Sequence, residues 1–506
     1  MITIPVKILD IRSLEPIVMI SHSTASRLKL RHDELLTLRH QNKEMVASPA
    51  VVQGIIEDNR IGISEEAANW LSVKDMDQIS VLSRKVPVSY DAIRRKYSDM
   101  QPWNTNEITG IVNDISRRRY TTLEVASFAL VSQFRGYNNS ELEDIAKSMA
   151  EAGTQLDFKE NTYDKHSIGG IPGNKITPVI VSIVAASGLL IPKTSSRAVT
   201  SPSGTADTME VLAEVEFTPD EITELAPKSR GMIVWNAPLN LSPLDDIVIN
   251  VKRQLEIDPQ DQMLASIVST KLAMGINNLI FDIPTGPGSK MPNRGSAINF
   301  AHSLIGLCRG LGIRVEAALT LGGQPLGYAI GPSLEAREVL QVLEGSGPQP
   351  VFEKSVDLAG IILEMGGLAP QGGGSNIAED LVKSGKALAK FKEIIEIQGG
   401  DPKITSEEVE IGKYSTAFEA TKDGYIVGID SKIISTIAKI AGCPQVKEAG
   451  ILLNVKQGDF VHRGDKLLTI FSNQETKLTQ ATQFMTNQSP FLLEGMVIQR
   501  LGSLAE

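Results

Sequence analysis

The sequence feature that most constrains the fold of this chain is a glycine cluster directly after a segment of cationic and hydroxyl side chains. The segment spans residues 165–175 and reads KHSIGGIPGNK. Glycines let backbone N–H groups approach an anion closely, and the apolar run 176–186 predicts a helix whose N-terminus faces that anion. Lys165 and Ser167 add a charge and a donor. The pattern predicts a phosphate cradle, with an ordinary glycine-rich turn as the alternative.

A second stretch of the same kind follows closely. Residues 194–207 read TSSRAVTSPSGTAD and precede a helical pattern over 208–214. Two neighbouring turns that are both suited to anion binding favour phosphate binding over ordinary turns. A Walker P-loop is excluded, because it needs Gly-Lys-Ser/Thr whereas Lys175 lies between Asn174 and Ile176.

KHSIGG followed by SSRAVTSPSGTAD resembles the phosphate-binding pair of the thymidine and pyrimidine-nucleoside phosphorylase family. The resemblance is closest to its archaeal-type AMP (nucleoside 5′-monophosphate) phosphorylases. It covers about residues 87 to 490 for the family as a whole, and the N-terminal segment as well for the AMP phosphorylases.

Composition limits the partners of the chain. It has 506 residues and a formal net charge of −10, which disfavours nucleic acid and anionic membranes and favours a small substrate held by local cations. Two cysteines, Cys308 and Cys443, fit a reducing compartment. No His or Cys has metal-ligand spacing, so no metal is expected. Without a signal peptide or a long apolar run, the sequence predicts a cytoplasmic protein.

The fold class expected is α/β, with four domains. Residues 1–86 read as short strands with small helical pieces and predict a small N-terminal β-barrel. Residues 87–157 predict a helical domain, with a further helical part at about 240–275. Residues 158–404 alternate strands and helices, which predicts a phosphate-binding α/β domain with parallel strands.

Two capping boxes support the helical domain. Thr121 with Glu124, and Ser140 with Glu143, have the Ser/Thr-x-x-Glu spacing of a helix start. Residues 371–376 predict a turn or lid hinge by their glycine content.

Residues 405–506 carry short strands punctuated by Gly-Asp turns and resemble the hammerhead domain that closes the phosphorylase family. Biotinyl and lipoyl carrier domains share such turns, but the Met-Lys-Met-type tip that they modify is absent here.

The resemblance implies the site residues. It assigns inorganic phosphate to Lys165, Ser167 and Ser195, with Thr205 beside them. It assigns the nucleotide to Gly170, Ser196, Arg197, Ala198, Val199, Thr200, Ser201, Thr205, Ser266 and Lys290. His166 matches the family histidine beside base and sugar, although a lone histidine is as often structural.

Asp258 aligns with the region that supplies the proton donor to the leaving base. Read without the resemblance, Asp258 before Pro259 predicts an N-cap with proline at N1 of a helix running to Met274. Ser266 lies two turns along that helix, so both side chains can line one cleft.

The base pocket departs from the nucleoside-specific enzymes. Thr270 stands where they carry a lysine, and Val251 lies near the position of their arginine, which puts thymidine specificity in doubt. Cations reappear at Lys290 and Arg294 after a predicted strand, where a second phosphate can dock. Lys290 matches the nucleotide-binding lysine of the family, whereas a binding role for Arg294 is inferred only from its charge and spacing.

The sequence therefore predicts a phosphorylase that converts AMP, and possibly CMP and UMP, with inorganic phosphate into free base and ribose 1,5-bisphosphate, without metal or cofactor. The alternatives are a thymidine or pyrimidine-nucleoside phosphorylase and a non-catalytic binding or assembly protein. Anthranilate phosphoribosyltransferase, a related architecture, is disfavoured by the hammerhead-like C-terminus and the missing carboxylate cluster. The resemblance implies a homodimer or a larger homo-oligomer.

Overall fold

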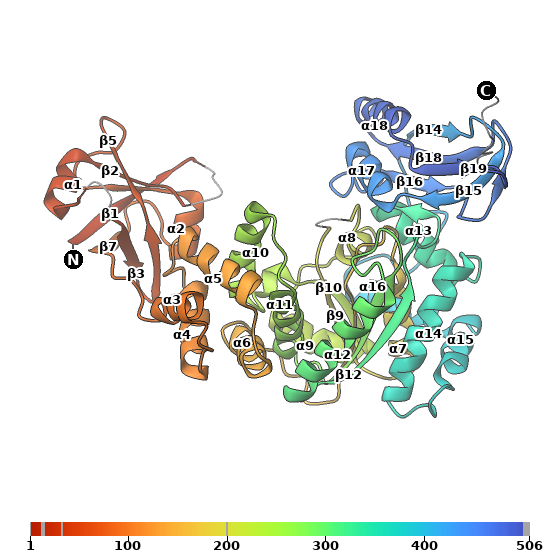
Figure 1. Ribbon diagram of the computed structural model, residues 1–506, viewed down its shortest axis with the longest axis horizontal. Helices are drawn as coiled ribbons and strands as arrows, with labels where there is room; N and C mark the ends of the chain where they lie inside the picture. The colour runs from red at the N-terminus through yellow and green to blue at the C-terminus, as the bar shows by residue number, and fades with distance from the viewer. Residues whose placement is uncertain (1, 12–15, 32–33, 199–200, 499–506) are drawn as a thin grey trace, which may run out of the picture. The chain divides into compact units, whose positions relative to one another are not determined.

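A computed structural model describes residues 2–11, 16–31, 34–198 and 201–498 of the chain (Figure 1). The fold class is mixed α/β, as predicted. The chain divides into two units: the first runs to Gln155 and includes Leu241–Ala273, and the second combines Leu156–Asn240 with the chain from Met274 onward.

The N-terminal strands form one seven-stranded mixed sheet in the order β4-β3-β7-β1-β6-β2-β5. Its core is made of inward-facing residues such as Val6, Ile20, Leu38 and Ile63, all fully buried. The elements are β1 (Ile2–Leu9), β2 (Val18–Ser21), α1 (His22–Leu28), β3 (Leu36–His40), β4 (Lys43–Ala47), β5 (Pro49–Val52), β6 (Ile61–Ser64), α2 (Glu65–Leu71) and β7 (Gln78–Ser83).

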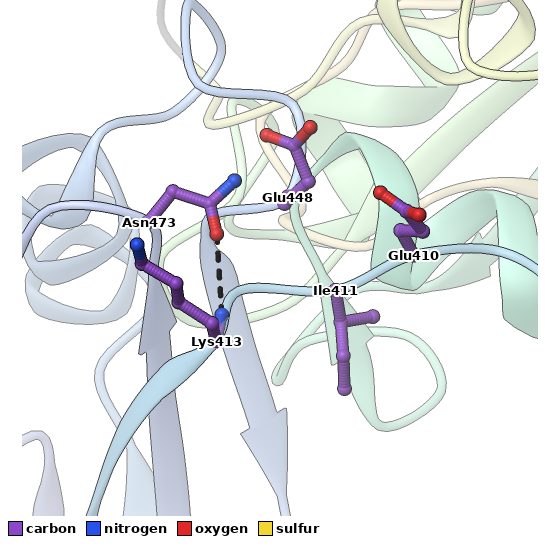
Figure 2. A pocket seen from close by; sticks show the side chains of 5 residues that line it. All are labelled: Glu410, Ile411, Lys413, Glu448 and Asn473. Atoms are coloured by element: carbon purple, nitrogen blue, oxygen red, sulfur yellow. Dashed lines mark hydrogen bonds between the residues drawn. The ribbon is translucent and has the colours of Figure 1, made fainter.

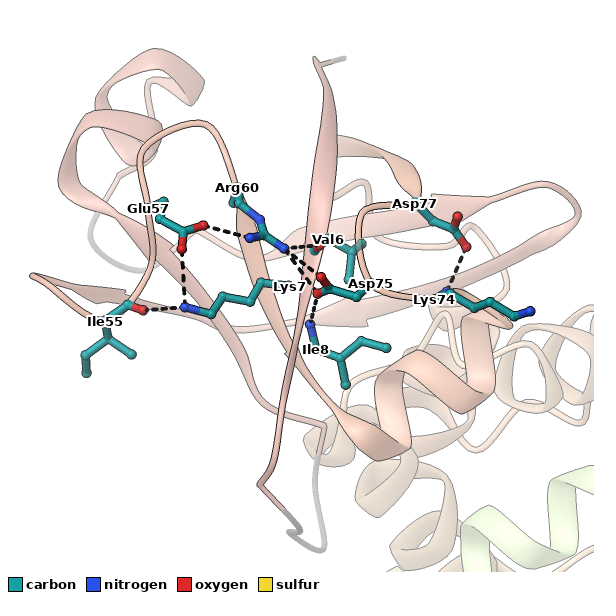
Figure 3. Close-up of polar contacts among 9 residues, drawn as sticks. All are labelled: Val6, Lys7, Ile8, Ile55, Glu57, Arg60, Lys74, Asp75 and Asp77. Carbon is teal, nitrogen blue, oxygen red and sulfur yellow. Dashed lines mark hydrogen bonds and ion pairs between the residues drawn. The ribbon is translucent and has the colours of Figure 1, made fainter.

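Polar contacts fasten the loops beside β1, as Figure 3 shows. Arg60 donates to the backbone oxygen of Val6 at 2.9 Å and pairs with Glu57 at 2.8 Å and Asp75 at 3.1 Å. Asp75 in turn accepts the N–H of Ile8 at 3.0 Å. Because Glu57 and Asp75 are more than half exposed, these pairs fix the loops and add little stability.

Helices make up the rest of the first unit: α3 (Tyr90–Asp99), α4 (Thr105–Ser116), α5 (Thr122–Arg135), α6 (Asn139–Glu151), α10 (Pro243–Leu255) and α11 (Gln260–Ala273). The capping box of Thr121 and Glu124 is confirmed. The box predicted at Ser140 is wrong. Asn138 caps α6 together with Glu141, because its side chain reaches the N3 amide and starts the helix two residues earlier.

Parallel strands form the centre of the second unit, as predicted. One sheet has the order β12-β11-β8, and β9 pairs in parallel with β10. The bounds are β8 (Tyr163–Ser167), β9 (Ile191–Ser195), β10 (Gly231–Trp235), β11 (Asn278–Thr285) and β12 (Arg314–Leu321). Helix α7 (Ile176–Ala186) has the predicted bounds, and its apolar side chains are buried in the main core.

The helix predicted over 208–214 is wrong. Helix α8 is short (Thr205–Met209), and the chain then turns. The physical reason is Gln398: its backbone oxygen accepts the N–H of Glu214 at 3.0 Å, and its side chain donates to the oxygen of Glu214 at 2.6 Å. The N–H of Glu214, which a helix continuing to residue 214 would donate to the oxygen of Glu210, is thereby used elsewhere.

Further helices belong to this part of the second unit: α9 (Pro219–Ser229), α12 (Arg294–Gly310), α13 (Pro332–Leu343), α14 (Gln349–Met365), α15 (Gly374–Lys383) and α16 (Lys386–Ile397). Of the glycine stretch 371–376, residues 371–373 form the predicted turn and residues 374–376 already belong to α15; Glu364 accepts the N–H groups of Gly372 and Gly374, each at 2.9 Å.

The C-terminal part, blue in Figure 1, has its own core and two small antiparallel sheets. Strand β13 (Ala329–Ile330) joins one of them and links it to the α/β part. The remaining elements are β14 (Tyr414–Glu419), β15 (Gly424–Ile429), α17 (Ser431–Ala441), β16 (Gly450–Leu453), β17 (Phe460–Val461), β18 (Lys466–Ser472), α18 (Glu475–Asn487) and β19 (Phe491–Glu494).

A buried ion pair in the helical part yields a stability prediction. Lys96 lies 2.5 Å from Glu141, both side chains are at most 6% exposed, and Glu141 also accepts the N–H of Trp103. Lys96→Met should lower the opening free energy of α6, measured by native-state hydrogen exchange, by about 3 kcal/mol, because it leaves a buried carboxylate unpaired. Lys147→Met is the control; it breaks an exposed pair with Glu151 and should cost under about 0.5 kcal/mol. Equal effects would contradict this.

Candidate active site

A buried chain of alternating charges lies beneath the first predicted phosphate loop. Lys165 on β8 and Lys354 on α14 both approach one oxygen of Asp282 on β11, at 3.7 and 3.1 Å. Thr320 on β12 donates to the other oxygen of Asp282 at 2.6 Å. All three charged side chains are at most 10% exposed. The aspartate therefore holds two lysines in a region that water barely reaches.

These charges determine the protonation of Lys165. Burial lowers its pKa to about 8, and Lys354 adds to the lowering, whereas Asp282 opposes it. Burial would raise the pKa of Asp282, but Lys165, Lys354 and the Thr320 bond outweigh burial and lower it. The Lys165 ammonium is therefore mostly charged at neutral pH, and an arriving anion would stabilise it further.

The glycine turn brings Lys290 to the first loop. Ser167 accepts the N–H of Gly169 and the side-chain amide of Asn174, both at 3.4 Å. Gly170 has φ +91°, and a side chain there would begin 3.3 Å from both the backbone nitrogen and the Cγ of Lys290. Glycine at 170 thus allows the loop carrying Lys290 to pack against the turn.

Asp207 organises the second predicted loop, a role that sequence reasoning missed. Its carboxylate accepts the N–H groups of Ala198 at 2.7 Å and Gly204 at 2.8 Å. The hydroxyl groups of Ser195 and Ser201 donate to backbone oxygens of the same loop.

Arg197 is committed to neighbouring side chains. Its guanidinium pairs with Glu210 and Glu216 and lies 4.3 Å from the centre of the Trp235 ring. Its side chain therefore stabilises the loop. Val199 and Thr200 lie outside the described residues.

A pocket of 440 Å³ brings predicted residues from both loops together with the C-terminal part. From the predicted set it contains Gly170, Ser201 and Lys290. Arg294 does not line it and is exposed at the first position of α12. The complete lining is Gly170, Pro172, Ser201, Gly288, Ser289, Lys290, Ser431, Lys432, Ser435, Thr436 and Lys439.

A second pocket, of 520 Å³, is drawn in Figure 2. It is lined by Glu410, Ile411, Lys413, Glu448 and Asn473, and Asn473 accepts the backbone N–H of Lys413 at 3.1 Å. Two carboxylates against one ammonium disfavour a phosphate, and none of the predicted site residues that the structure describes lines this pocket.

The predicted cap at Asp258 is wrong. Helix α11 begins at Gln260, and the oxygen of Pro259 accepts the N–H of Met263, so Pro259 is the N-cap and not N1. Asp258 lies one residue before the cap, with its side chain 61% exposed and its carboxylate 3.9 Å from the ammonium of Lys252. This carboxylate is accessible to a ligand.

Ser266 belongs to an acidic cluster that the sequence did not reveal. Its hydroxyl donates to Asp245 at 2.6 Å, and burial raises the pKa of Asp245 despite that bond. Burial and the neighbouring Asp245 raise the pKa of Asp246 to about 6, against the opposing charge of Arg118. Both aspartates lie in the first turn of α10, where acidic residues are ordinarily attributed to the helix dipole.

The remaining predictions concern His166, metals and membranes. His166 is partly buried and stacks on Phe281, with ring centres 5.1 Å apart. Among the described residues, no group of three or more His, Cys, Asp or Glu side chains is placed to hold a metal ion. Within the same residues, no helix combines the length and apolarity needed to cross a membrane.

Comparisons with known proteins show which family the chain resembles. Residues 159–388 match the glycosyl transferase family, a/b domain, and residues 425–491 match the pyrimidine nucleoside phosphorylase C-terminal domain. The chain is 43% identical to an AMP phosphorylase of Thermococcus kodakarensis and 41% identical to one of Methanocaldococcus jannaschii, each over 99% of both chains.

A solved structure shows the same fold at low sequence identity. Anthranilate phosphoribosyltransferase from Thermus thermophilus superposes with a TM-score of 0.52 at 16% identity, over 61% of this chain and 99% of its own. At that identity the likeness concerns the fold alone.

The charge chain predicts how anion binding depends on pH. Because the lowered pKa of Lys165 is about 8, its ammonium is present below that pH and is lost as the pH rises through it. The dissociation constant of inorganic phosphate, measured by calorimetry, should rise about tenfold per pH unit above pH 8.

Lys354→Met provides the matched variant. Because Lys354 lowers the pKa of Lys165, removing it should move the rise in the phosphate dissociation constant to higher pH. A dissociation constant that stays flat to about pH 10 would show that Lys165 does not bind the anion.

Proposed function

The chain belongs to the family of AMP phosphorylases, and on that premise we propose that it cleaves nucleoside 5′-monophosphates with inorganic phosphate to free base and ribose 1,5-bisphosphate. AMP is the first substrate proposed, and CMP and UMP are further ones. An oxygen of phosphate bonds to C1′ while the bond to the base nitrogen breaks and its electron pair leaves with the base, which takes up a proton.

One observation carries the proposal. The second unit has two separate cationic positions, the buried Lys165 and the pocket-lining Lys290. Gly170 lets the loops that carry them pack against each other. An attacking phosphate needs a fixed counter-charge, and a substrate with its own phosphate needs a second one. A nucleoside phosphorylase would need only the first.

We assign roles on this basis. Lys165, Ser167 and Ser195 bind inorganic phosphate; Gly170, residues 196–201, Thr205 and Lys290 bind the nucleotide; and Ser266 binds it from the helical part. His166 lies beside the base and sugar. Asp258 protonates the leaving base, a role that an accessible carboxylate can perform once a substrate covers it. The protein is proposed to act in the cytoplasm as a homodimer or larger assembly.

The reaction is tested by following adenine released from AMP. Release should require inorganic phosphate, and ribose 1,5-bisphosphate should appear in equal amount. A preference for thymidine over AMP would instead favour a pyrimidine-nucleoside phosphorylase, consistent with the C-terminal match. No release from any nucleotide or nucleoside would favour a binding or assembly protein.

Asp258→Asn tests the proton donor. Turnover should fall about 10²–10⁴-fold with AMP affinity retained, the usual contribution of a positioned general acid. Stability should be unchanged because Asp258 is exposed and does not cap α11. Asp246→Asn is measured beside it; a larger loss of turnover there would assign the proton to Asp246.

Lys290→Ala tests the second anion position. The apparent KM for AMP should rise roughly ten- to hundred-fold, because a charge-assisted bond to the 5′-phosphate is worth about 1.5–3 kcal/mol. Adenosine has no phosphate to lose, so its reaction should be unchanged. Arg294→Ala should have a smaller effect, since Arg294 lies outside the pocket. Equal weakening of both substrates by Lys290→Ala would contradict the role.

A further inference from the structure

The pocket that contains Lys290 has a second wall made by helix α17 of the C-terminal part. Lys432, Ser435, Thr436 and Lys439 recur at the spacing of one helical face and all line the pocket. The opposite face of α17 packs into the C-terminal core through residues such as Ile434. The helix is therefore amphipathic, and its polar face is turned to the pocket.

The lining has the chemistry of an anion site. Three of the described residues that line the pocket are cationic: Lys290, Lys432 and Lys439. The described lining contains no carboxylate and no large apolar side chain. A nucleobase would call for aromatic or apolar surface. Three ammonium groups surrounded by serine and threonine hydroxyls instead match a phosphate monoester.

Ser431 supplies an independent indication that a ligand binds here. It lines the pocket, is 5% exposed, and its hydroxyl has no hydrogen-bond partner among the residues that the structure describes. Buried hydroxyls ordinarily have partners, so this one is placed to donate to a bound molecule. The first backbone N–H groups of α17 are already bound by Asp430, so recognition here comes from side chains.

We propose that α17 completes the 5′-phosphate subsite, with Lys432 and Lys439 opposite Lys290 and with Ser431 as a hydroxyl donor. The inference rests on the proposed function and deepens it. It makes the C-terminal part a specificity determinant: it selects substrates that carry a phosphate on the ribose, while the α/β part binds the attacking phosphate.

Charge removal on α17 tests this directly. The double variant Lys432→Gln, Lys439→Gln should raise the apparent KM for AMP ten- to hundred-fold, with kcat nearly unchanged and the adenosine reaction unaffected. Both lysines are exposed, so the fold should be retained, which a melting curve verifies. Lys422→Gln, an exposed lysine outside the lining, is the control and should leave KM unchanged.

Direct binding separates this inference from the proposed reaction. Ribose 5-phosphate, measured by calorimetry, should bind wild type and bind the double variant and Ser431→Ala more weakly. That difference supports the subsite even if no nucleotide is cleaved, which would refute only the proposed reaction. Unchanged ribose 5-phosphate binding in the double variant, or no binding to wild type, would overturn the inference. Equal losses for AMP and adenosine would also overturn it.

Discussion

The carboxylate of Asp282 is the group on which the arrangement of the site depends. A lysine buried as deeply as Lys165 is costly to keep charged, and an isolated buried ammonium would give up its proton. Asp282 makes the charge tolerable, while Lys354 keeps Asp282 from neutralising Lys165 completely. The result is an ammonium whose pKa is lowered to about 8 and which still attracts an anion.

Strand order places these charges. Strand β11 lies between β8 and β12, so Asp282 is beside β8, which carries Lys165, and beside β12, which carries Thr320. The loops that follow β8 and β11 then emerge at the same edge of the sheet, as is usual for ligand sites in parallel sheets. Gly170 and Lys290 meet there, and α17 adds its lysines from a segment far along the chain.

Local patterns were predictable from the sequence. Helix α7 has the predicted bounds because its apolar run and the preceding glycines suffice to define it, and the Thr121 capping box needs only four residues. Local rules also failed where two solutions competed. Asn138 caps α6 in place of Ser140. Gln398 hydrogen-bonds to the backbone of Glu214, which therefore does not extend α8.

Long-range pairs were beyond sequence reasoning. Nothing near Asp282 or Lys354 in the sequence indicates that they share an ion pair, because strand order and helix packing bring them together. The polar face of α17 likewise reads as an ordinary solvated surface until the fold sets it against Lys290. In the sequence, Asp245 and Asp246 look like ordinary acidic residues at the start of a helix. Only their burial in the structure, which raises the pKa of both, sets them apart from such residues.

The central claim is that two anions bind at separate places, one at Lys165 and one between Lys290 and α17. A crystal structure of the protein with AMP and sulfate, an unreactive substitute for phosphate, tests it most directly. We expect sulfate beside Lys165 and Ser167, with the AMP phosphate in the pocket against Lys290 and Lys432. An AMP phosphate beside Lys165, with the pocket lined by α17 left empty, would contradict it.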